Sequence, residues 1–206
     1  MSKISSAPKI KQNKTVTRLA LIQAGTEIIL EKGFNNTGID QVLKKVGVPK
    51  GSFYYYFKSK DDFGLSIIEY HAELLIRGLQ NTFSNSALTP LQRIREYFNS
   101  GRCSIEQNAC RKGCLFGNLG QEMADQNETF RLHLAEIFHQ WCKTLSDCIQ
   151  EAQQQGDIPS QMNPDCLAEY LMFSWEGAIM RCKITKSLQP VDNYLHFVFE
   201  ELLKNR

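Results

Sequence analysis

Apolar residues recur at intervals of three and four along nearly the whole chain, which is the spacing of one face of an α-helix. The first apolar stripe contains Val16, Leu19, Ala20, Ile22, Ala24, Ile28 and Ile29. It ends at Lys32-Gly33, and a cation followed by glycine is typical of a helix C-terminus. No segment alternates between apolar and polar residues as a half-buried strand would. The sequence therefore predicts an all-α fold.

Capping and turn residues divide the next stretch into three helices. Thr37 is placed to cap a short helix over about 38–46. The residues of this helix that are predicted to face inward are Ile39, Val42, Leu43 and Val46. Gly47-Val48-Pro49 predicts a tight turn, which is followed by a third short helix over 50–56. Ser59 and Asp62 have the spacing of a capping box, which predicts a long helix to about residue 83.

Five further helices are predicted in the rest of the chain. Thr89-Pro90 combines a cap with a proline at the first helical position. Pro159 and Pro190 mark the later breaks. The predicted helices lie near residues 90–108, 114–123, 127–155, 164–186 and 191–204.

Charge is distributed unevenly along the chain. Residues 1–60 hold eleven Lys and Arg against three Asp and Glu, whereas residues 61–206 hold thirteen against nineteen. A basic front half suits a polyanion such as DNA, although chance clustering on a solvated face is the alternative. We therefore predict a basic flexible arm (1–13), a DNA-binding domain (14–60) and a second domain for sensing and dimerisation (61–206).

The composition predicts a cytoplasmic protein. No apolar run reaches the roughly 18 residues that a membrane span needs. The segment MSKISSAPKIKQNK is basic, but no apolar stretch follows it, so a secretory signal is not expected. The seven cysteines form no regular framework, which favours reduced thiols.

The segment KGSFYYYFKSK (50–60) carries the clearest functional signal. A helix, a turn containing Gly47 and a short helix form the helix-turn-helix arrangement, whose second helix enters the major groove. Phe53 and Phe57 share one face and can anchor the short helix, so the tyrosines between them point outward. Against DNA, their hydroxyls can bind phosphates and their rings can pack on sugars and thymine methyls. The alternative is a helical hairpin with tyrosines in its core, but three consecutive residues cannot all face inward.

Lysines and helix N-termini add to this candidate interface. Lys58 and Lys60 bring positive charge, and the helix starts at Thr37 and Lys50 can direct free N–H groups at phosphates. The candidate DNA-binding residues are Thr37, Lys50, Gly51, Ser52, Tyr54, Tyr55, Tyr56, Lys58 and Lys60.

The stretch EKGFNNTGIDQVLKKVGVPKGSFYYYFKSKDDF, within Ala20 to Phe63, resembles the DNA-binding domain of the TetR family of transcriptional repressors. Gly38 and Tyr56 depart from it, because such proteins often have Ser or Thr and His there. The resemblance implies a two-part repressor of nine or ten helices, with an N-terminal helix-turn-helix and a C-terminal helical domain for dimerisation and ligand binding. It also implies a homodimer in which the last two long helices of each subunit form a four-helix bundle.

The sequence itself supports such a bundle. Residues 164–186 and 191–204 carry more apolar surface than one partner helix needs, although packing within the chain alone is the alternative. The candidate dimerisation residues are Tyr170, Phe173, Gly177, Leu195 and Phe199. A dimer would present two reading helices to one face of DNA, which favours a palindromic operator.

Cys114 is the best candidate for a reactive thiol. It follows Arg111 and Lys112 at the start of a predicted helix, and both the cations and the helix terminus favour the thiolate. Cys103 and Cys110 are placed to resolve an oxidised Cys114 as a disulfide. The other cysteines lie in helical stripes, where packing is the usual role, namely Cys142, Cys148, Cys166 and Cys182.

Gly-Cys-Leu at Cys114, with Cys182-Lys183-Ile184-Thr185 downstream, resembles a branch of the TetR family. That branch includes repressors that answer N-ethylmaleimide and other electrophiles, or small unsaturated acids such as acrylate. The resemblance implies that Cys114 and Lys183 lie near each other and sense the effector. The alternative is that Cys114 is packed or only lines a pocket.

A reversible ligand pocket is the second interpretation of the same region. Aromatic and apolar side chains can line it, and equally can form plain core, namely Tyr97, Phe116, Phe138, Trp141, Met172 and Trp175. Asn118, Gln121 and Arg181 are candidate polar anchors. The candidate sensing residues are Cys114, Lys183, Phe116, Gln121, Trp141 and Trp175.

The sequence favours neither catalysis nor a metal or other cofactor. His139 and Cys142 are three residues apart on one helical face and His133 lies a turn and a half earlier, but no third ligand at useful spacing stands out. No catalytic motif is present either. We therefore predict a repressor, not an enzyme, whose partners are operator DNA, a second copy of itself and a small-molecule or electrophile effector, with no membrane. The alternatives are an activator or dual regulator with a non-covalent ligand, an enzyme that carries a helix-turn-helix, and a nonspecific DNA-coating protein.

Overall fold

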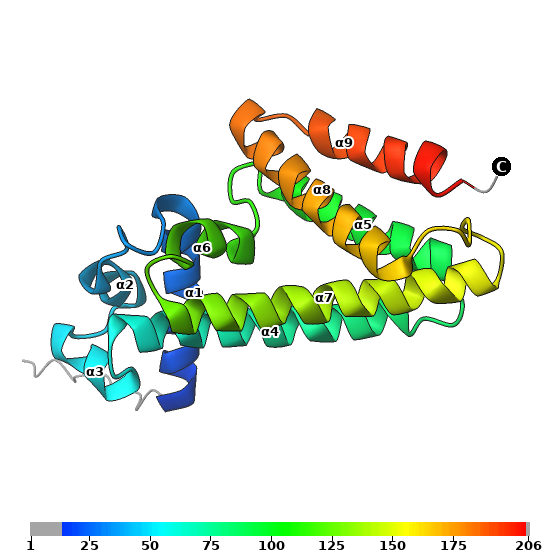
Figure 1. The fold of residues 1–206 in the computed structure, drawn as a ribbon. Coiled ribbons are helices and arrows are strands. Elements are labelled where there is room, and N and C mark those ends of the chain that lie inside the picture. The colour runs from blue at the N-terminus through cyan, green and yellow to red at the C-terminus, as the bar shows by residue number, and fades with distance from the viewer. Residues whose placement is uncertain (1–13, 205–206) are drawn as a thin grey trace, which may run out of the picture.

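The computed structural model describes residues 14–204, and over these residues the fold is all-helical, as predicted (Figure 1). The elements are α1 (Lys14–Lys32), α2 (Ile39–Val46), the 3-10 turn η1 (Lys50–Ser52), α3 (Phe53–Tyr56), α4 (Lys60–Phe83), α5 (Pro90–Gln107), α6 (Leu115–Met123), α7 (Glu128–Gln154), α8 (Pro164–Thr185), α9 (Gln189–His196) and the π-helical segment η2 (Phe197–Leu202). The predicted basic arm, 1–13, lies outside the described residues.

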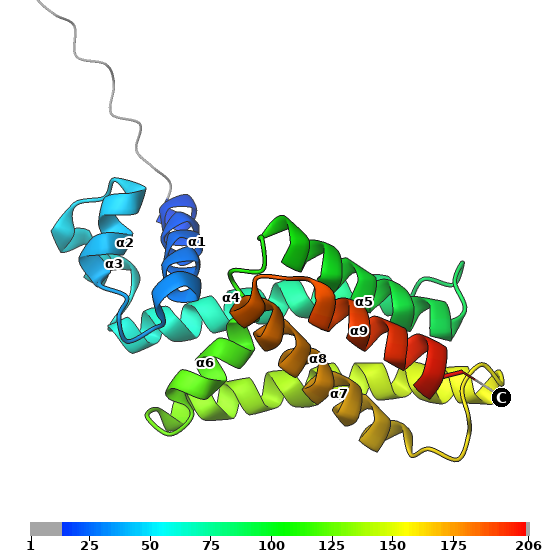
Figure 2. The ribbon, with the colours of Figure 1, turned by 90° about the horizontal axis from the view of Figure 1, so that it is seen from above.

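The molecule has two ends joined by long helices. Helices α1, α2 and α3 form one end, and α5, α8 and α9 form the other (Figures 1 and 2). Helices α4 and α7 extend from the first end toward the second and pack against each other. The short α6 contacts both α1 and α7, so it lies where the two ends meet. Within 14–204, no helix is long and apolar enough to cross a membrane.

The buried face of α1 differs from the predicted stripe. Ile22 and Ile28 are buried as predicted for a helix that packs against α2 and α4, and Leu21, which the stripe did not include, is buried as well. Val16 and Leu19 are instead exposed by 60% and 37%. At 3.6 residues per turn, Val16 and Leu19 lie on the opposite side of the helix from Leu21. Thr17 is the residue that continues the buried face toward the N-terminus.

Two of the predicted caps are also corrected. The N-cap of α2 is Gly38, and the buried Thr37 hydroxyl instead donates to the carbonyl of Gly33 at 2.7 Å. Ser59 caps α4, because its Oγ accepts from Asp62 N–H at 3.0 Å. The Asp62 carboxylate accepts from Lys58 N–H at 2.8 Å and not from Ser59, so the reciprocal half of the capping box is displaced by one residue.

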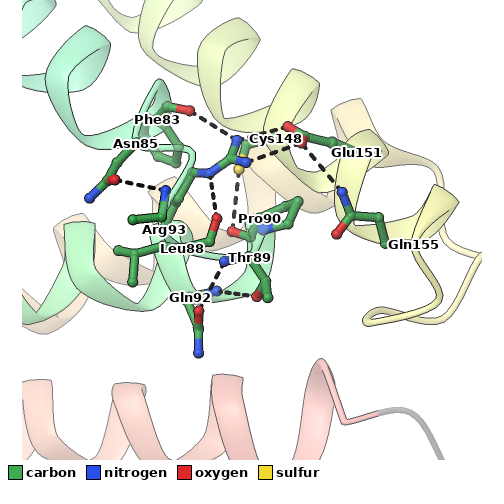
Figure 3. A network of polar contacts seen from close by, with 11 residues as sticks. Phe83, Asn85, Leu88, Thr89, Pro90, Gln92, Arg93, Cys148, Glu151 and Gln155 are labelled. Carbon is green, nitrogen blue, oxygen red and sulfur yellow. Dashed lines mark hydrogen bonds and ion pairs between the residues drawn. The ribbon is translucent and has the colours of Figure 1, made fainter.

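Arg93 joins the α4–α5 corner to the end of α7 (Figure 3). Its guanidinium donates to both Glu151 carboxylate oxygens, at 2.9 and 3.1 Å, and to the carbonyls of Phe83 and Leu88. Beside it, the buried Cys148 thiol donates to the carbonyl of Pro90, and burial raises the pKa of that thiol to about 12. Cys148 is thus a packing cysteine, as predicted.

Candidate functional site

The short helix α3 is held by an aromatic cluster that leaves its tyrosines exposed. Phe53 and Phe57 are buried, and their ring centroids lie 5.5 and 4.8 Å from that of Phe63 on α4. Burying each ring contributes about 1.5–3 kcal/mol. Tyr54 and Tyr55 are 68% and 64% exposed, while Tyr56 is half-buried. The anchoring role of the two phenylalanines is therefore confirmed.

The turn before α3 has the geometry that its sequence predicts. Gly47 ends α2 in the left-handed conformation (φ 73°), which glycine adopts without steric cost. Val48 N–H then donates to the carbonyl of Leu43 at 3.0 Å, and the Ser52 hydroxyl donates to that of Pro49 at 2.6 Å. These bonds fix α3 at an angle to α2, as in a helix-turn-helix.

Not all of the candidate DNA-binding residues are equally available. Lys58 is exposed, and Lys50 is exposed although it pairs with the exposed Asp40 at 2.6 Å. Lys60 instead donates to the carbonyl of Asn35 at 3.0 Å and lies over the Phe34 ring, while Thr37 is buried. The candidates in and next to α3 that are exposed are Lys50, Gly51, Tyr54, Tyr55 and Lys58.

Sequence reasoning missed one cation at this surface. The Lys14 ammonium lies 4.3 Å from the centroid of the Tyr55 ring, so the start of α1 adds charge beside α3. The basic character of residues 1–14 was the signal, but Lys14, the first residue of the predicted DNA-binding domain, was not among the candidate contacts.

A cavity of about 610 Å³ lies between α6, α7 and α8. Its apolar wall comprises Phe138, Met172, Phe173, Ile179 and Met180. Its polar groups include Cys114, Asn118, Gln121, Glu176 and Lys183. The structure therefore brings Cys114 and Lys183 to one cavity, together with the predicted anchors Asn118 and Gln121.

Several aromatic residues predicted to line this cavity do not. Trp175 is buried between Phe98 and Tyr194, with ring centroids 5.1 and 5.3 Å away. Trp141 stacks behind Phe138 at 5.9 Å and lines a separate cavity of about 360 Å³ between α4 and α7.

Three more of the predicted lining residues lie elsewhere. Phe116 is buried with its ring centroid 6.5 Å from that of Trp141. Tyr97 packs near Trp141, and Arg181 is exposed. Helical periodicity could not separate core from cavity wall, because both kinds of residue face inward from the same helices.

Cys114 lies at the start of α6, as predicted, but its surroundings favour the protonated thiol and not the predicted thiolate. It is the N-cap of α6, and its Sγ accepts from Gly117 N–H at 3.4 Å. Burial and the Glu176 carboxylate raise the pKa of Cys114, and this outweighs the N–H groups of Gly117 and Phe116, which act in the opposite direction. After burial, the side chain with the largest influence on the pKa of this thiol is thus Glu176, and not Arg111 or Lys112. The predicted stabilisation of the thiolate by those cations is wrong.

Glu176 is the cavity residue that sequence reasoning missed. Its Oε1 is buried and has no hydrogen-bond partner among the described residues. Its Oε2 lies against Gly117, where an added Cβ would approach to 2.3 Å. Burial raises the pKa of Glu176, which favours the uncharged carboxyl. The available signal was a lone acidic residue in the apolar stretch SWEGAIM.

The other cysteines also pair differently from the prediction. Burial and the neighbouring Cys110 thiol raise the pKa of Cys182 near the end of α8, and both residues are buried. Cys103 is exposed on α5. Cys110 adopts a left-handed backbone (φ 55°), which directs it from the α5–α6 loop toward α8.

We therefore expect oxidation to join Cys110 to Cys182 and not to Cys114. Diamide, which gains the two electrons and two protons that the thiol pair loses, should produce a Cys110–Cys182 disulfide visible by peptide mass mapping. Cys182→Ser should abolish this product, whereas Cys103→Ser should not. A disulfide that contains Cys114 in the wild-type protein would contradict the expectation.

The far end of α6 contacts the DNA-binding domain. The Glu122 carboxylate accepts from the backbone N–H groups of Phe34 and Asn35, each at 2.7 Å. These two N–H groups lie in the loop between α1 and α2. Residues of α6 therefore line the cavity near one end and bind the helix-turn-helix at the other, a contact that the sequence did not predict.

An apolar stripe follows the outer face of α8. Tyr170, Phe173, Met180 and Ile184 are exposed, and Gly177 lies between them. Their spacing alternates between three and four residues, as in the a and d positions of a coiled coil. Leu195 on α9 is half-buried.

Phe199 does not belong to an exposed face. It is buried against Phe98, and the Arg95 guanidinium lies 4.5 Å from its ring centroid. Its predicted place at a dimer surface is therefore corrected, because the π-helical turn of η2 directs it into the core of its own chain.

A basic helix-turn-helix joined to a helical domain with a cavity is the architecture of a DNA-binding transcriptional regulator. Comparison with known families agrees. The family described as bacterial regulatory proteins, tetR family, matches residues 21–66. The family described as tetracyclin repressor-like, C-terminal domain, matches residues 90–198.

Whole-chain relatives lead to the same family. The HTH-type transcriptional repressor DhaR of Mycobacterium sp. (strain GP1) is 36% identical over 92% of this chain and 94% of its own. The transcriptional regulator AcuR of Cereibacter sphaeroides is 37% identical over 93% and 90%. The HTH-type transcriptional repressor NemR of Escherichia coli (strain K12) is 29% identical over 91% and 94%.

Solved structures extend this similarity to the fold. A crystal structure of the regulatory protein TetR from Rhodobacter sphaeroides superposes with a TM-score of 0.86 at 37% identity, covering 91% of this chain and 99% of that one. The chain belongs to the TetR family of DNA-binding transcriptional regulators, which are not enzymes.

Proposed function

We propose that the chain is a homodimeric repressor that leaves a palindromic operator when a small molecule occupies the cavity between α6, α7 and α8. The observation that carries the proposal is the position of α6. Cys114 and Gln121 place it in the cavity wall, and Glu122 binds the α1–α2 loop of the DNA-binding domain. A ligand that displaces α6 would thereby change the orientation of α3. Such a ligand shifts the equilibrium by its difference in affinity for the two states.

The apolar stripe of α8 supports the homodimer. Exposed large apolar side chains at a and d spacing are costly to leave in water and pack well against a second copy. Two-fold pairing would place the two α3 helices on one side of the dimer, where they could enter successive major grooves of the DNA. The division at residue 60 fits this proposal, because α4 begins there and reaches into the second part.

The sign of regulation follows from the relatives. DhaR and NemR are both named repressors, and their similarity to this chain extends over nine-tenths of its length. DNA upstream of the gene for this chain is the natural place to find the operator. Nuclease protection there should reveal two symmetric half-sites about one helical turn apart. Uniform coating without sequence preference would contradict the proposal.

The candidate DNA surface gives a sharper prediction. Tyr54→Ala should weaken operator binding by about 1–3 kcal/mol, roughly 5- to 150-fold, because an exposed ring loses its contact with DNA. Its thermal stability should stay within about 0.5 kcal/mol of wild type, since the side chain packs little in the free protein. Lys50→Ala should also reduce the salt dependence of binding.

Fluorescence anisotropy on labelled operator at several salt concentrations measures both effects. Leu132→Ala is the matched control, because Leu132 is also an exposed large apolar side chain but lies on α7. If both Tyr54→Ala and Lys50→Ala bind the operator with wild-type affinity, α3 is not part of the DNA interface.

We further infer that the effector binds reversibly. The raised pKa of Cys114 favours the unreactive thiol, which argues against rapid alkylation. Stoichiometric N-ethylmaleimide should therefore not release the operator within minutes. Rapid release of wild type, with Cys114→Ser resistant, would establish a covalent sensor instead.

A further inference from the structure

The effector cavity contains one acid and one base that do not pair with each other. Glu176 and Lys183 both line it from α8. Seven residues separate them, which is two helical turns and a rise of about 10 Å on one side of the helix. Within the described residues, neither side chain forms an ion pair. The cavity therefore offers two separate polar positions to one ligand.

The Cys114 thiol is a hydrogen-bond donor beside Glu176, but it leaves the Oε1 atom of Glu176 unpaired. This oxygen is buried. Gly117 has no side chain to offer, and a Cβ there would collide with Oε2. Buried acceptors are normally paired, so an unpaired one in a cavity wall is a position for a ligand's donor.

The Lys183 end is positively charged. Lys183 is half-buried, with its Cδ lying 3.5 Å from where a Cβ on Gly113 would be. It also lines a small adjoining cavity together with Arg111 and Lys112. Lys183 lines both cavities, whereas Arg111 and Lys112 line only the adjoining one, and together these cations favour an anionic group at Lys183. A carboxylate there would gain charge-assisted hydrogen bonds.

We propose that the effector is a small monoanionic hydroxy acid, whose carboxylate binds at Lys183 and whose hydroxyl donates to Glu176. This inference rests on the proposed function, since it assigns the ligand of the same cavity. The apolar side chains Phe138, Met172 and Ile179 would contact the carbon chain between the two groups.

Charge balance selects a hydroxyl over an ammonium as the donor. Burial raises the pKa of Glu176, which favours the neutral carboxyl. A neutral Glu176 leaves Lys183 as the net charge of the pair, and a monoanion neutralises it. An amino acid would require Glu176 to ionise in a buried site, which desolvation opposes.

Four matched ligands test the assignment on the purified full-length protein. The hydroxy acid probes are 4-hydroxybutyrate and its longer homologue 6-hydroxyhexanoate. Butyrate lacks the donor, 1-butanol lacks the anion, and 4-aminobutyrate carries a charged donor. Calorimetry should give binding of at least one hydroxy acid, at least 10-fold tighter than butyrate and 1-butanol.

Variants of the two polar residues make the test specific. Glu176→Leu and Lys183→Met should each weaken binding of the hydroxy acid at least 10-fold. Glu176→Gln keeps a neutral acceptor and should retain binding to within about 3-fold. Glu169→Gln and Lys186→Met are matched controls, because both residues are exposed and neither lines the cavity.

The outcomes separate the inference from the proposed function. Operator affinity is measured on the same samples. If neither hydroxy acid binds at about 10 mM while the operator is bound, the ligand assignment fails and the repressor stands. Tighter binding of 4-aminobutyrate, lost in Glu176→Gln, would also overturn it in favour of a zwitterion. If wild type does not bind the operator, the proposed function itself fails.

Discussion

Phe173→Asp is expected to convert the protein to a monomer and to weaken operator binding at least about 100-fold. Phe173 is 68% exposed in the described chain and lies at the centre of the apolar stripe on α8. In a two-fold dimer the substitution occurs twice, so two carboxylates would enter one apolar seam. Each unpaired buried charge costs about 3–5 kcal/mol.

Sedimentation velocity measures the change in mass, and anisotropy on the operator measures its consequence. Leu132→Asp is the matched control, because Leu132 is also exposed but lies on α7 outside the stripe. The control should remain dimeric. If Phe173→Asp remains dimeric at low micromolar concentration, α8 is not the seam, and the exposed stripe requires a different partner.

Glu122→Ala is expected to weaken operator binding at least about 10-fold and to abolish release by ligand. Its carboxylate accepts two backbone hydrogen bonds at 2.7 Å from the α1–α2 loop. Hydrogen bonds to a charged group each contribute about 1.5–3 kcal/mol, and removing the acceptor also leaves two N–H groups unpaired. The DNA-binding domain would then no longer follow the position of α6.

Hydrogen exchange at Phe34 and Asn35 reports this loss directly, and both amides should exchange faster in Glu122→Ala. Glu128→Ala is the matched control, because it removes an exposed ion pair with Arg131 on α7, which is expected to contribute little. Unchanged exchange together with normal release would assign signal transmission to α4 instead. This helix, which Ser59 caps, is connected to α3 through the chain itself.

The sequence anticipated those features that depend on local order. Periodic apolar positions and caps such as Thr89-Pro90 locate most helices to within a few residues, because helix formation and capping involve neighbours along the chain. The spacing of Phe53 and Phe57 identified the exposed face of α3 for the same reason. The error at Val16 arose because Thr17, a polar residue, continues the buried face of α1. The error at Thr37 arose because its hydroxyl donates to the carbonyl of Gly33 instead of capping α2.

The functional cavity and its connections were decided by tertiary packing. Glu122 binds a loop that lies 88 residues earlier in the chain. Cys110 approaches Cys182 and not Cys114, because the end of α8 packs beside the α5–α6 loop. Glu176 and Cys114 meet across two helices, and that contact reversed the expected charge environment of the thiol. From its sequence alone the chain is determined as a helical TetR-family DNA-binding protein, since its motifs are contiguous. Which buried groups face one another is settled only when separate helices pack, because the periodicity of one helix gives the direction of its inner face but not its neighbour.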